Sequence, residues 1–280
     1  MLKARVAFIA AAGLILISGN APAQESQDAA STDAQKSEDL AKKLANPVSS
    51  LISIPFQNNY DWGLNEDHSG TQYKVNIQPV VPIKLNNDWN LISRTIAPII
   101  AQDNIAVRSG YQAGMGDITQ SFFFSPQAPT AGIIWGLGPV ALLPSATETL
   151  LGSGKWGLGP TAVALKQDGP WTIGMLMNQI WSVAGDRDRT KVNATFLQPF
   201  LALTTHHATT FTIDSESTYD WVAGQWTVPV NLEIAQILPP KMTGLPVPLQ
   251  VQLGYRYYFA KPAGGPREGL RLNLIVLLPR

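Results

Sequence analysis

Apolar and polar residues alternate with a period of two over most of this chain. The clearest stretch is residues 247–259, where Leu253 and Tyr255 fall on one face and Gln252 and Arg256 fall on the other. Such alternation is typical of β-strands that have one apolar and one polar face. The pattern therefore predicts an all-β protein.

Turn residues separate twelve such segments. They are residues 51–62, 71–83, 88–102, 115–125, 131–143, 155–166, 170–183, 190–204, 208–221, 225–238, 247–259 and 270–278. An even number of strands suits a closed antiparallel barrel whose two termini lie on the same side of a membrane. If the first strand runs outward, most outer connections are longer than most inner ones, as in outer-membrane barrels. Residues 222–224 and 239–246 are exceptions. The predicted fold is a transmembrane, up-and-down antiparallel β-barrel over residues 46–280.

Tryptophans lie at the ends of these segments, where an amphipathic ring meets both hydrocarbon and water. The predicted interface belt consists of Trp62, Trp156, Trp181, Trp221 and Trp226 at the outer edge and Trp89 and Trp171 at the inner edge. Trp135 falls inside its predicted span and is the exception. The placement favours two membrane interfaces over a soluble core.

Seven prolines fall inside predicted strands, where each removes a hydrogen bond from the ladder. They are Pro79, Pro82, Pro98, Pro139, Pro160, Pro199 and Pro229. We therefore expect an irregular barrel with bulges at several of them.

The N-terminal region differs from the rest. Residues 1–23 combine a basic start, a short apolar run and small residues before Gln24, which predicts a cleaved signal peptide; the run is too short for a retained membrane anchor. Residues 24–45 form a polar leader, either a tail or a plug inside the barrel. A short helix is expected there, with Ser37 as its N-cap.

Composition agrees with a lipid-facing surface. Only 14% of residues are charged and 45% are hydrophobic, against roughly 25% charged in soluble domains. Removing Lys3 and Arg5 leaves 18 basic and 20 acidic residues, a net charge of −2 without a basic patch, so nucleic acid is not an expected partner. Cysteine is absent, which excludes disulfides and thiol chemistry. A soluble exported β-protein is the competing fold.

Charges on otherwise alternating strands must face water, and in a barrel this means the lumen. The selectivity candidates are Lys74, Arg94, Asp117, Lys166, Glu233, Arg256 and Arg271. Both signs occur, so strong ion selectivity is not indicated. The alternative is that these charges pair with one another and close the lumen.

A repeated motif, Trp-Gly-Leu-Gly-Pro, occurs in two neighbouring strands. Its glycines are Gly136 and Gly138 in the first copy and Gly157 and Gly159 in the second. Alternate glycines thin one face, which either permits a kink with close backbone approach or leaves room for a substrate. The tripeptides at 60–62 and 219–221, both Tyr-Asp-Trp, are interpreted as belt elements and not as a site.

No catalytic signature is found, so an enzyme is not expected. The chain has no nucleophile-elbow or zinc-protease motif and no phosphate-binding loop, and neither a cofactor nor a metal is predicted. His68 is assigned to an outer loop, whereas His206 and His207 form an inner turn, so they cannot share a site.

Several segments together resemble one family: LISIPFQNNYDWG, GMGDITQSFFFSP, the two WGLGP copies and STYDWVAGQWTVPVN. The chain resembles proteobacterial outer-membrane proteins labelled as transporters, sometimes as neuromedin U-like, and looks related to proteins of phenol-degradation (MetA) pathways. The resemblance covers roughly residues 40–280. It implies a barrel in the outer membrane and no ligand residues.

The first functional hypothesis is a passive channel or transporter for small molecules, including small hydrophobic or aromatic solutes. The expected partners are outer-membrane lipid, the outer-membrane assembly machinery and an unidentified small solute. The alternatives are a closed structural or surface-interaction barrel and a soluble exported protein.

Overall fold

Residues 34–106 and 109–278 are described by the computed structural model, and most of them belong to strands of one sheet. The strands are β1 (Ile52–Leu64), β2 (Gly70–Ile77), β3 (Val80–Lys84), β4 (Trp89–Asp103), β5 (Tyr111–Met115), β6 (Ile118–Pro126), β7 (Ile134–Leu143), β8 (Lys155–Asp168), β9 (Trp171–Gly185), β10 (Asn193–Thr204), β11 (Thr209–Asp214), β12 (Ser217–Asp220), β13 (Gln225–Leu238), β14 (Leu249–Ala260) and β15 (Glu268–Leu278). The predicted signal peptide lies outside the described residues.

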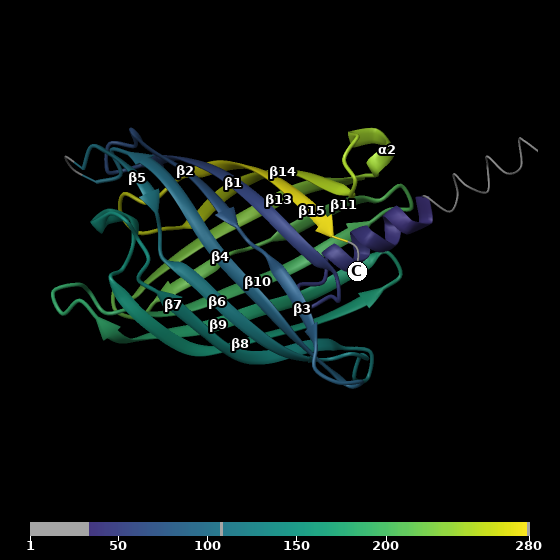
Figure 1. Cartoon of the computed structure of the whole chain (residues 1–280). Helices are drawn as coiled ribbons and strands as arrows, with labels where there is room; N and C mark the ends of the chain where they lie inside the picture. Colours follow the sequence, from purple (N-terminus) through teal and green to yellow (C-terminus); the bar gives the residue numbers. More distant parts are fainter. Residues whose placement is uncertain (1–33, 107–108, 279–280) are drawn as a thin grey trace, which may run out of the picture. The chain divides into compact units, whose positions relative to one another are not determined.

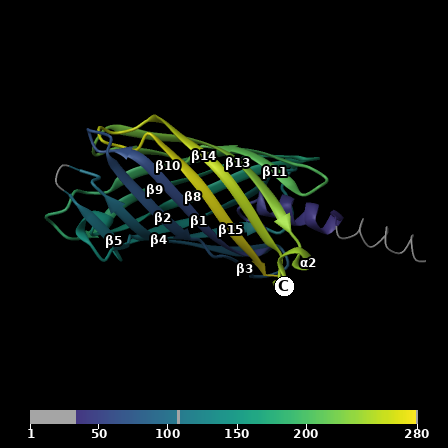
Figure 2. The ribbon, with the colours of Figure 1, turned by 90° about the horizontal axis from the view of Figure 1, so that it is seen from above.

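Three pairs of these strands are single membrane-length strands with a two-residue break. The breaks fall between β2 and β3, between β5 and β6 and between β11 and β12. Joining each pair reduces the fifteen strands to the predicted twelve. All ladders are antiparallel, β1 pairs with β15, and β9 pairs with β10, so the sheet closes on itself (Figures 1 and 2). The prediction of an up-and-down barrel is confirmed.

The two ends of the barrel differ. The helix end carries the N-terminal helix, the end of β15 and the turns after β3, β6, β8 and β10 (Figure 1). The loop end carries the connections after β1, β4, β7, β9, β12 and β14. One connection at the helix end is longer than its neighbours and contains the short helix α2 (Pro240–Thr243).

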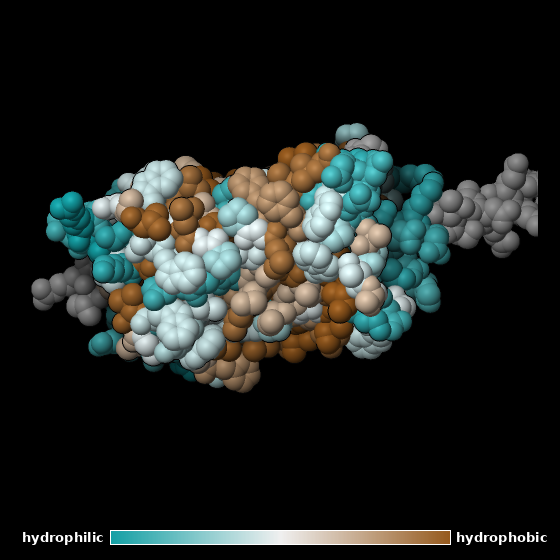
Figure 3. All heavy atoms as spheres, turned by 90° about the horizontal axis from the view of Figure 1, so that it is seen from below, coloured by the Kyte–Doolittle hydropathy of each residue, from teal (hydrophilic) through white to brown (hydrophobic). Residues whose placement is uncertain are grey.

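The outer face is apolar across its middle. Leu232, Leu253 and Leu270 are each more than half exposed, because alternate residues of β13, β14 and β15 point outward. Figure 3 shows hydrophobic side chains across the middle of one face and hydrophilic ones towards both ends. A soluble β-protein does not expose large aliphatic side chains over such a band.

The tryptophans occupy both rims, with one correction to the expected positions. Trp135 does not lie in mid-span: β7 begins at Ile134, so Trp135 is the second residue of its strand. Its ring meets that of Trp89 edge-on at 5.8 Å between centroids. Residues 131–132 form a turn closed by a bridge between Thr130 and Ile133, so they are not the start of the strand. Trp135 thus belongs with the tryptophans of the helix end.

Irregularities occur at several of the prolines, as expected. Pro79 lies in the break between β2 and β3, and the register of β13 against β14 shifts between Val228 and Pro229. Pro139 and Pro160 stand directly opposite each other in the β7–β8 ladder. Neither proline has a backbone N–H to donate to the strand on its other side. The β6–β7 ladder is interrupted at Pro139 and the β8–β9 ladder at Pro160.

The N-terminal helix covers residues 34–44 of the described chain. Ser37 is therefore inside the helix and is not its N-cap, a correction explained by the good helix formers Ala34, Gln35 and Lys36 before it. Ala41 is buried at the helix end in an apolar cluster with Ala208, Ile237, Ile275 and Leu277. In the part of the chain that is described, no helix has the length and apolarity needed to cross a membrane.

Candidate functional site in the lumen

The inner faces of β13, β14, β15 and β1 carry most of the buried charge. Two rows of side chains cross these strands in register. The first row is Glu233, Gly254, Arg271 and Asn59; the second is Asn231, Arg256, Gly269 and Asp61. Each row has a glycine between partners, so a side chain on one strand can reach across it.

Gly254 makes the first contact possible. A Cβ there would lie 2.9 Å from the side chain of Glu233 and 3.4 Å from that of Arg271. With that space free, Nη1 of Arg271 lies 2.9 Å from Oε1 of Glu233, and its Nε donates to Oδ1 of Asn59 at 2.8 Å. In the second row, a Cβ on Gly269 would lie 2.2 Å from Oδ1 of Asp61. Both glycines serve close side-chain packing.

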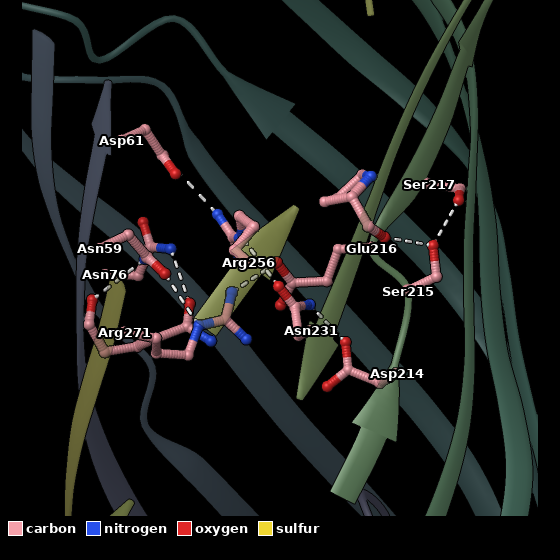
Figure 4. Close-up of polar contacts among 12 residues, drawn as sticks. Asn59, Asp61, Asn76, Asp214, Ser215, Glu216, Ser217, Asn231, Arg256 and Arg271 are labelled. Atoms are coloured by element: carbon pink, nitrogen blue, oxygen red, sulfur yellow. Dashed lines mark hydrogen bonds and ion pairs between the residues drawn. The ribbon is translucent and has the colours of Figure 1, made fainter. Parts of the chain in front are cut away.

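Glu216 joins the two rows. It lies in the break between β11 and β12, and its Oε2 is 2.6 Å from Nη2 of Arg256 and 2.7 Å from Nη2 of Arg271. Figure 4 shows this carboxylate between the two guanidinium groups. We name Asp61, Glu216, Glu233, Arg256 and Arg271 the luminal charge cluster. Paired charges inside a barrel wall need hydrogen bonds to satisfy them, and flanking amides supply such bonds to Glu233, Arg256 and Arg271.

Amides surround the cluster. Asn231 accepts from Nε of Arg256 at 2.8 Å and donates to Oδ1 of Asp214 at 2.6 Å. Asn273 donates to Gln252 at 3.1 Å, and Gln252 in turn donates to Glu233. Within the described chain, two buried oxygens of this region have no partner, Oδ1 of Asp61 and Oδ1 of Asn273. Asp61 was interpreted from sequence as a belt element, and this is wrong: it is buried and lies 3.7 Å from Arg256.

The structure brings together only some of the predicted selectivity residues. Glu233, Arg256 and Arg271 form the cluster, and Lys74 stands opposite Asn59 in the neighbouring ladder. Arg94 lies apart and donates to Oε1 of Gln78 at 3.1 Å.

Asp117 and Lys166 lie away from the luminal charge cluster. Lys166 faces outward, because Val163, Leu165 and Gln167 of β8 take the inner positions, and it pairs with the exposed Asp168 at 3.3 Å. Its position near the helix end of the strand keeps it near water. Asp117 lies at the loop end, between β5 and β6. The expectation that Lys166 lines the lumen is therefore wrong.

Asp117 holds the connection between β7 and β8. Its Oδ2 accepts from the backbone N–H of Ser153 at 2.6 Å and from its hydroxyl at 2.7 Å, and Oδ1 accepts from Ala146 at 3.2 Å. Arg189 donates to the carbonyl of Thr149 at 2.8 Å. We name residues 144–154 the inward loop, because its Leu151 is buried.

The inward loop packs on a glycine-lined patch of the inner wall. A Cβ on Gly114 would meet Oγ1 of Thr147 at 2.0 Å, and one on Gly116 would meet the carbonyl of Leu151 at 3.1 Å. Gln102 donates to the carbonyl of Leu150 at 3.4 Å. The loop therefore occupies the lumen at the loop end and is not simply a surface loop.

At the helix end the lumen is apolar. Val48, Ile92, Phe123, Val163, Leu165 and Leu176 form one buried cluster. Val48 belongs to the segment between the N-terminal helix and β1, so this segment packs inside the wall. Between it and the charge cluster is a cavity of about 210 Å³, lined by Leu44, Gln57, Arg94, Leu176 and Arg271 among others.

Contacts with the wall fix the N-terminal helix in place. Glu38 is buried, pairs with Lys42 at 2.8 Å and contacts Nδ1 of His206 at 3.0 Å. These hydrogen bonds, that from Lys42 first, lower the pKa of Glu38 below its ordinary value. Gln167 donates to the carbonyl of Lys42 at 2.8 Å. His206 thus has a structural contact, consistent with its predicted turn.

The repeated Trp-Gly-Leu-Gly-Pro motif serves close backbone approach. A Cβ on Gly138 would lie 1.9 Å from the carbonyl oxygen of Phe122, and one on Gly159 would lie 1.7 Å from that of Gln179. Gly136 is covered by Phe123 and Val48 at 3.1 and 3.4 Å. Gly157 is covered by Ile180 at 2.6 Å. These contacts favour the kink over a substrate passage.

Comparison with known proteins supports the fold. No family model and no curated protein sequence matches the chain. The structure is similar to an outer membrane channel from Pseudomonas putida F1, with a TM-score of 0.62 and 15% identity over 82% of this chain and 96% of that chain. A more distant likeness is to outer membrane phospholipase A from Escherichia coli, with a TM-score of 0.47 and 9% identity over 81% and 90% of the two chains. The similarity to the channel shows that the chain has the fold of an outer-membrane β-barrel.

Sequence reasoning missed Glu216, Asp61 and Asp214. Glu216 was overlooked because the break before β12 disturbs the alternation, so its direction cannot be counted from the strand. Asp61 and Asp214 keep the alternation of their strands and fall on inner positions. Counting polar residues on that face would have found these two.

Proposed function

We propose that the protein is an outer-membrane barrel through which small solutes pass by diffusion, with the N-terminal helix as a removable plug. The apolar outer band, the tryptophans at both rims and the fold support a place in outer-membrane lipid. The outer-membrane assembly machinery would insert the barrel, and the solute is a small molecule. We propose no catalytic role.

One observation carries this proposal: the cavity has a wall of barrel strands and a floor from a segment that is not part of the barrel. Ala41, Leu44 and Pro47 form that floor. A structural barrel is stabilised most simply by side chains from its own strands, as in small filled barrels. A cavity closed by a separate segment suits a lumen that opens when the segment leaves.

Planar-bilayer conductance tests the proposal. We expect the chain lacking residues 24–45 to conduct more often or at higher conductance than the mature protein. Because deletion can disturb folding, Ala41→Glu offers a second route: it places a charge in the buried helix contact and should also raise conductance. Lys43→Glu is the matched control, since residue 43 is exposed on the same helix. If neither the deletion variant nor Ala41→Glu conducts in planar bilayers, the proposed channel function is wrong.

The second candidate is a closed structural or surface-interaction barrel. The ion pairs of the luminal charge cluster and the inward loop favour it, because both fill the lumen with fixed contacts. Deletion of residues 144–154 would then abolish binding of a surface partner and leave uptake unchanged. Recovery of the protein in the soluble periplasmic fraction would exclude both membrane functions.

A further inference from the structure

Arg94 is a half-buried arginine of the lumen that lacks an acidic partner. Arg256 and Arg271 both contact carboxylates, whereas in residues 34–106 and 109–278 no carboxylate lies within 4.0 Å of Arg94. Its one hydrogen bond is to Gln78. A guanidinium has five N–H donors, so most of its capacity is left for another group.

The amides beside Arg94 hold it in position. Gln78 accepts from Arg94 through Oε1 and donates through Nε2 to Oε1 of Gln57 at 2.9 Å. Asn76 donates to the same Gln57 oxygen at 3.0 Å. This network fixes the amide orientation of Gln78, so the guanidinium is held against the cavity wall before any ligand arrives. Held in advance, a binding group loses less conformational entropy on binding.

The same cavity has an apolar side. Leu44, Val80, Leu176, Phe200 and Ile275 line it with Arg94. Its volume of about 210 Å³ exceeds that of an engineered cavity of roughly 150 Å³ that binds benzene, so it suits a molecule with a single ring or a short chain. A ligand that matches both sides has one small charged head and an apolar body.

The other charged groups on the cavity wall are already engaged. Glu216 and Glu233 pair with the arginines of the cluster, and Asp214 accepts from Asn231. Asp214 is on β11, six strands around the twelve-stranded wall from β4, which carries Arg94. A negative head would therefore bind at Arg94, on the opposite side of the barrel from Asp214.

We propose that this cavity binds small amphipathic monocarboxylates, with the carboxylate paired to Arg94 and the apolar part against Leu176 and Phe200. Guanidinium and carboxylate form paired, charge-assisted hydrogen bonds that an uncharged analogue cannot make. The inference rests on the proposed channel, because it names the class of solute that the channel would pass. Binding itself can be measured without transport.

Titration calorimetry of the full mature chain with benzoate tests this site. We expect saturable binding by the wild type, binding of neutral benzamide weaker by about tenfold or more, and no detectable benzoate binding by Arg94→Gln. Lys166→Gln is the matched control: it removes one positive charge from the outer face and should bind benzoate as the wild type does. Equal binding of benzoate and benzamide, or full binding by Arg94→Gln, would overturn the proposal.

A second variant tests the site independently, in case Arg94→Gln fails to fold. Phe200→Trp keeps Arg94 and fills part of the cavity, so it should also weaken benzoate binding; unchanged binding would place the ligand elsewhere. Folding of each variant is checked by the heat-dependent migration of the intact barrel in gels. A protein that binds benzoate but never conducts would refute the channel alone, whereas a conducting protein that does not bind benzoate would refute the carboxylate site alone.

Discussion

The two halves of the lumen are built from different chemistry. The half near the helix end is packed with aliphatic and aromatic side chains around Val48 and Ala41, like the core of a soluble protein. The half near the loop end is held by ion pairs and amides and by the inward loop. Both halves line the same barrel, although the interior of a membrane-spanning barrel is usually polar throughout.

This difference follows from what each half contacts. Near the helix end, the wall meets a segment of the same chain that carries Val48, Leu44 and Ala41, so apolar wall residues gain contacts and lose water. Near the loop end, side chains of the wall meet mainly one another, and charge pairs with hydrogen-bonded amides fill the space. A segment inserted from one end can therefore change the residue types that a barrel interior tolerates.

The largest effect is expected from breaking the charged half. Arg271→Met leaves Glu233 without its ion pair and removes one of the two partners of Glu216, both inside the wall. Loss of one partner of a buried pair typically costs about 3–5 kcal/mol. Urea unfolding in detergent micelles should show this fall in the free energy of unfolding.

The control for that loss is a double variant. Adding Glu233→Gln to Arg271→Met removes the uncompensated charge and should recover part of the stability. If the single and double variants are equally stable, the ion pair is not what holds this half together.

A smaller or comparable effect is expected in the apolar half. Leu176→Ala leaves a cavity at a position that is 1% exposed and should destabilise the barrel by about 2–5 kcal/mol, as buried leucine truncations do. The same urea titration measures it. Leu245→Ala, in the exposed connection before β14, should change the free energy by less than about 0.5 kcal/mol. Equal effects of the two truncations would contradict a packed core at the helix end.

The smallest effect is expected on the attachment of the N-terminal helix to the barrel when the pH is lowered. Because its folded-state pKa is lowered, Glu38 stabilises the docked helix above the ordinary glutamate pKa, and this contribution is lost as pH falls through the lowered value. Proteolysis of the 34–44 segment should therefore be faster at pH 3 than at pH 5, with an acid-stable protease. Glu38→Gln should remove most of that difference; an unchanged pH response would assign the effect to another group.

The fold could be predicted from sequence because a barrel repeats one simple rule. Alternation predicted twelve strands whose bounds lie within a few residues of those observed, and residues 225–238 coincide with β13. The breaks at Gln78, Gly116 and Ser215 could not be placed, since a two-residue irregularity leaves the average alternation almost unchanged.

The site was harder to predict, because it depends on register between strands. Arg271 pairs with Glu233 only because Gly254 separates them in the ladder, a relation between three strands that a single sequence does not display. Lys166 shows a second difficulty. A charged residue near the end of a strand can reach water outside the barrel as well as in the lumen, so its charge alone does not tell which face it occupies. The inward loop was also unpredicted, since nothing in its composition distinguishes it from an exposed loop.

The short link between the N-terminal helix and β1 has a kinetic consequence. Residues 45–51 are seven residues, which can extend over at most roughly 23–25 Å. A released helix would stay within that distance of the barrel mouth, so its rebinding is intramolecular, with an effective concentration in the millimolar range for short linkers. Closure would then be fast and independent of protein concentration, and a free peptide of the same sequence would compete for the mouth only at comparable concentrations.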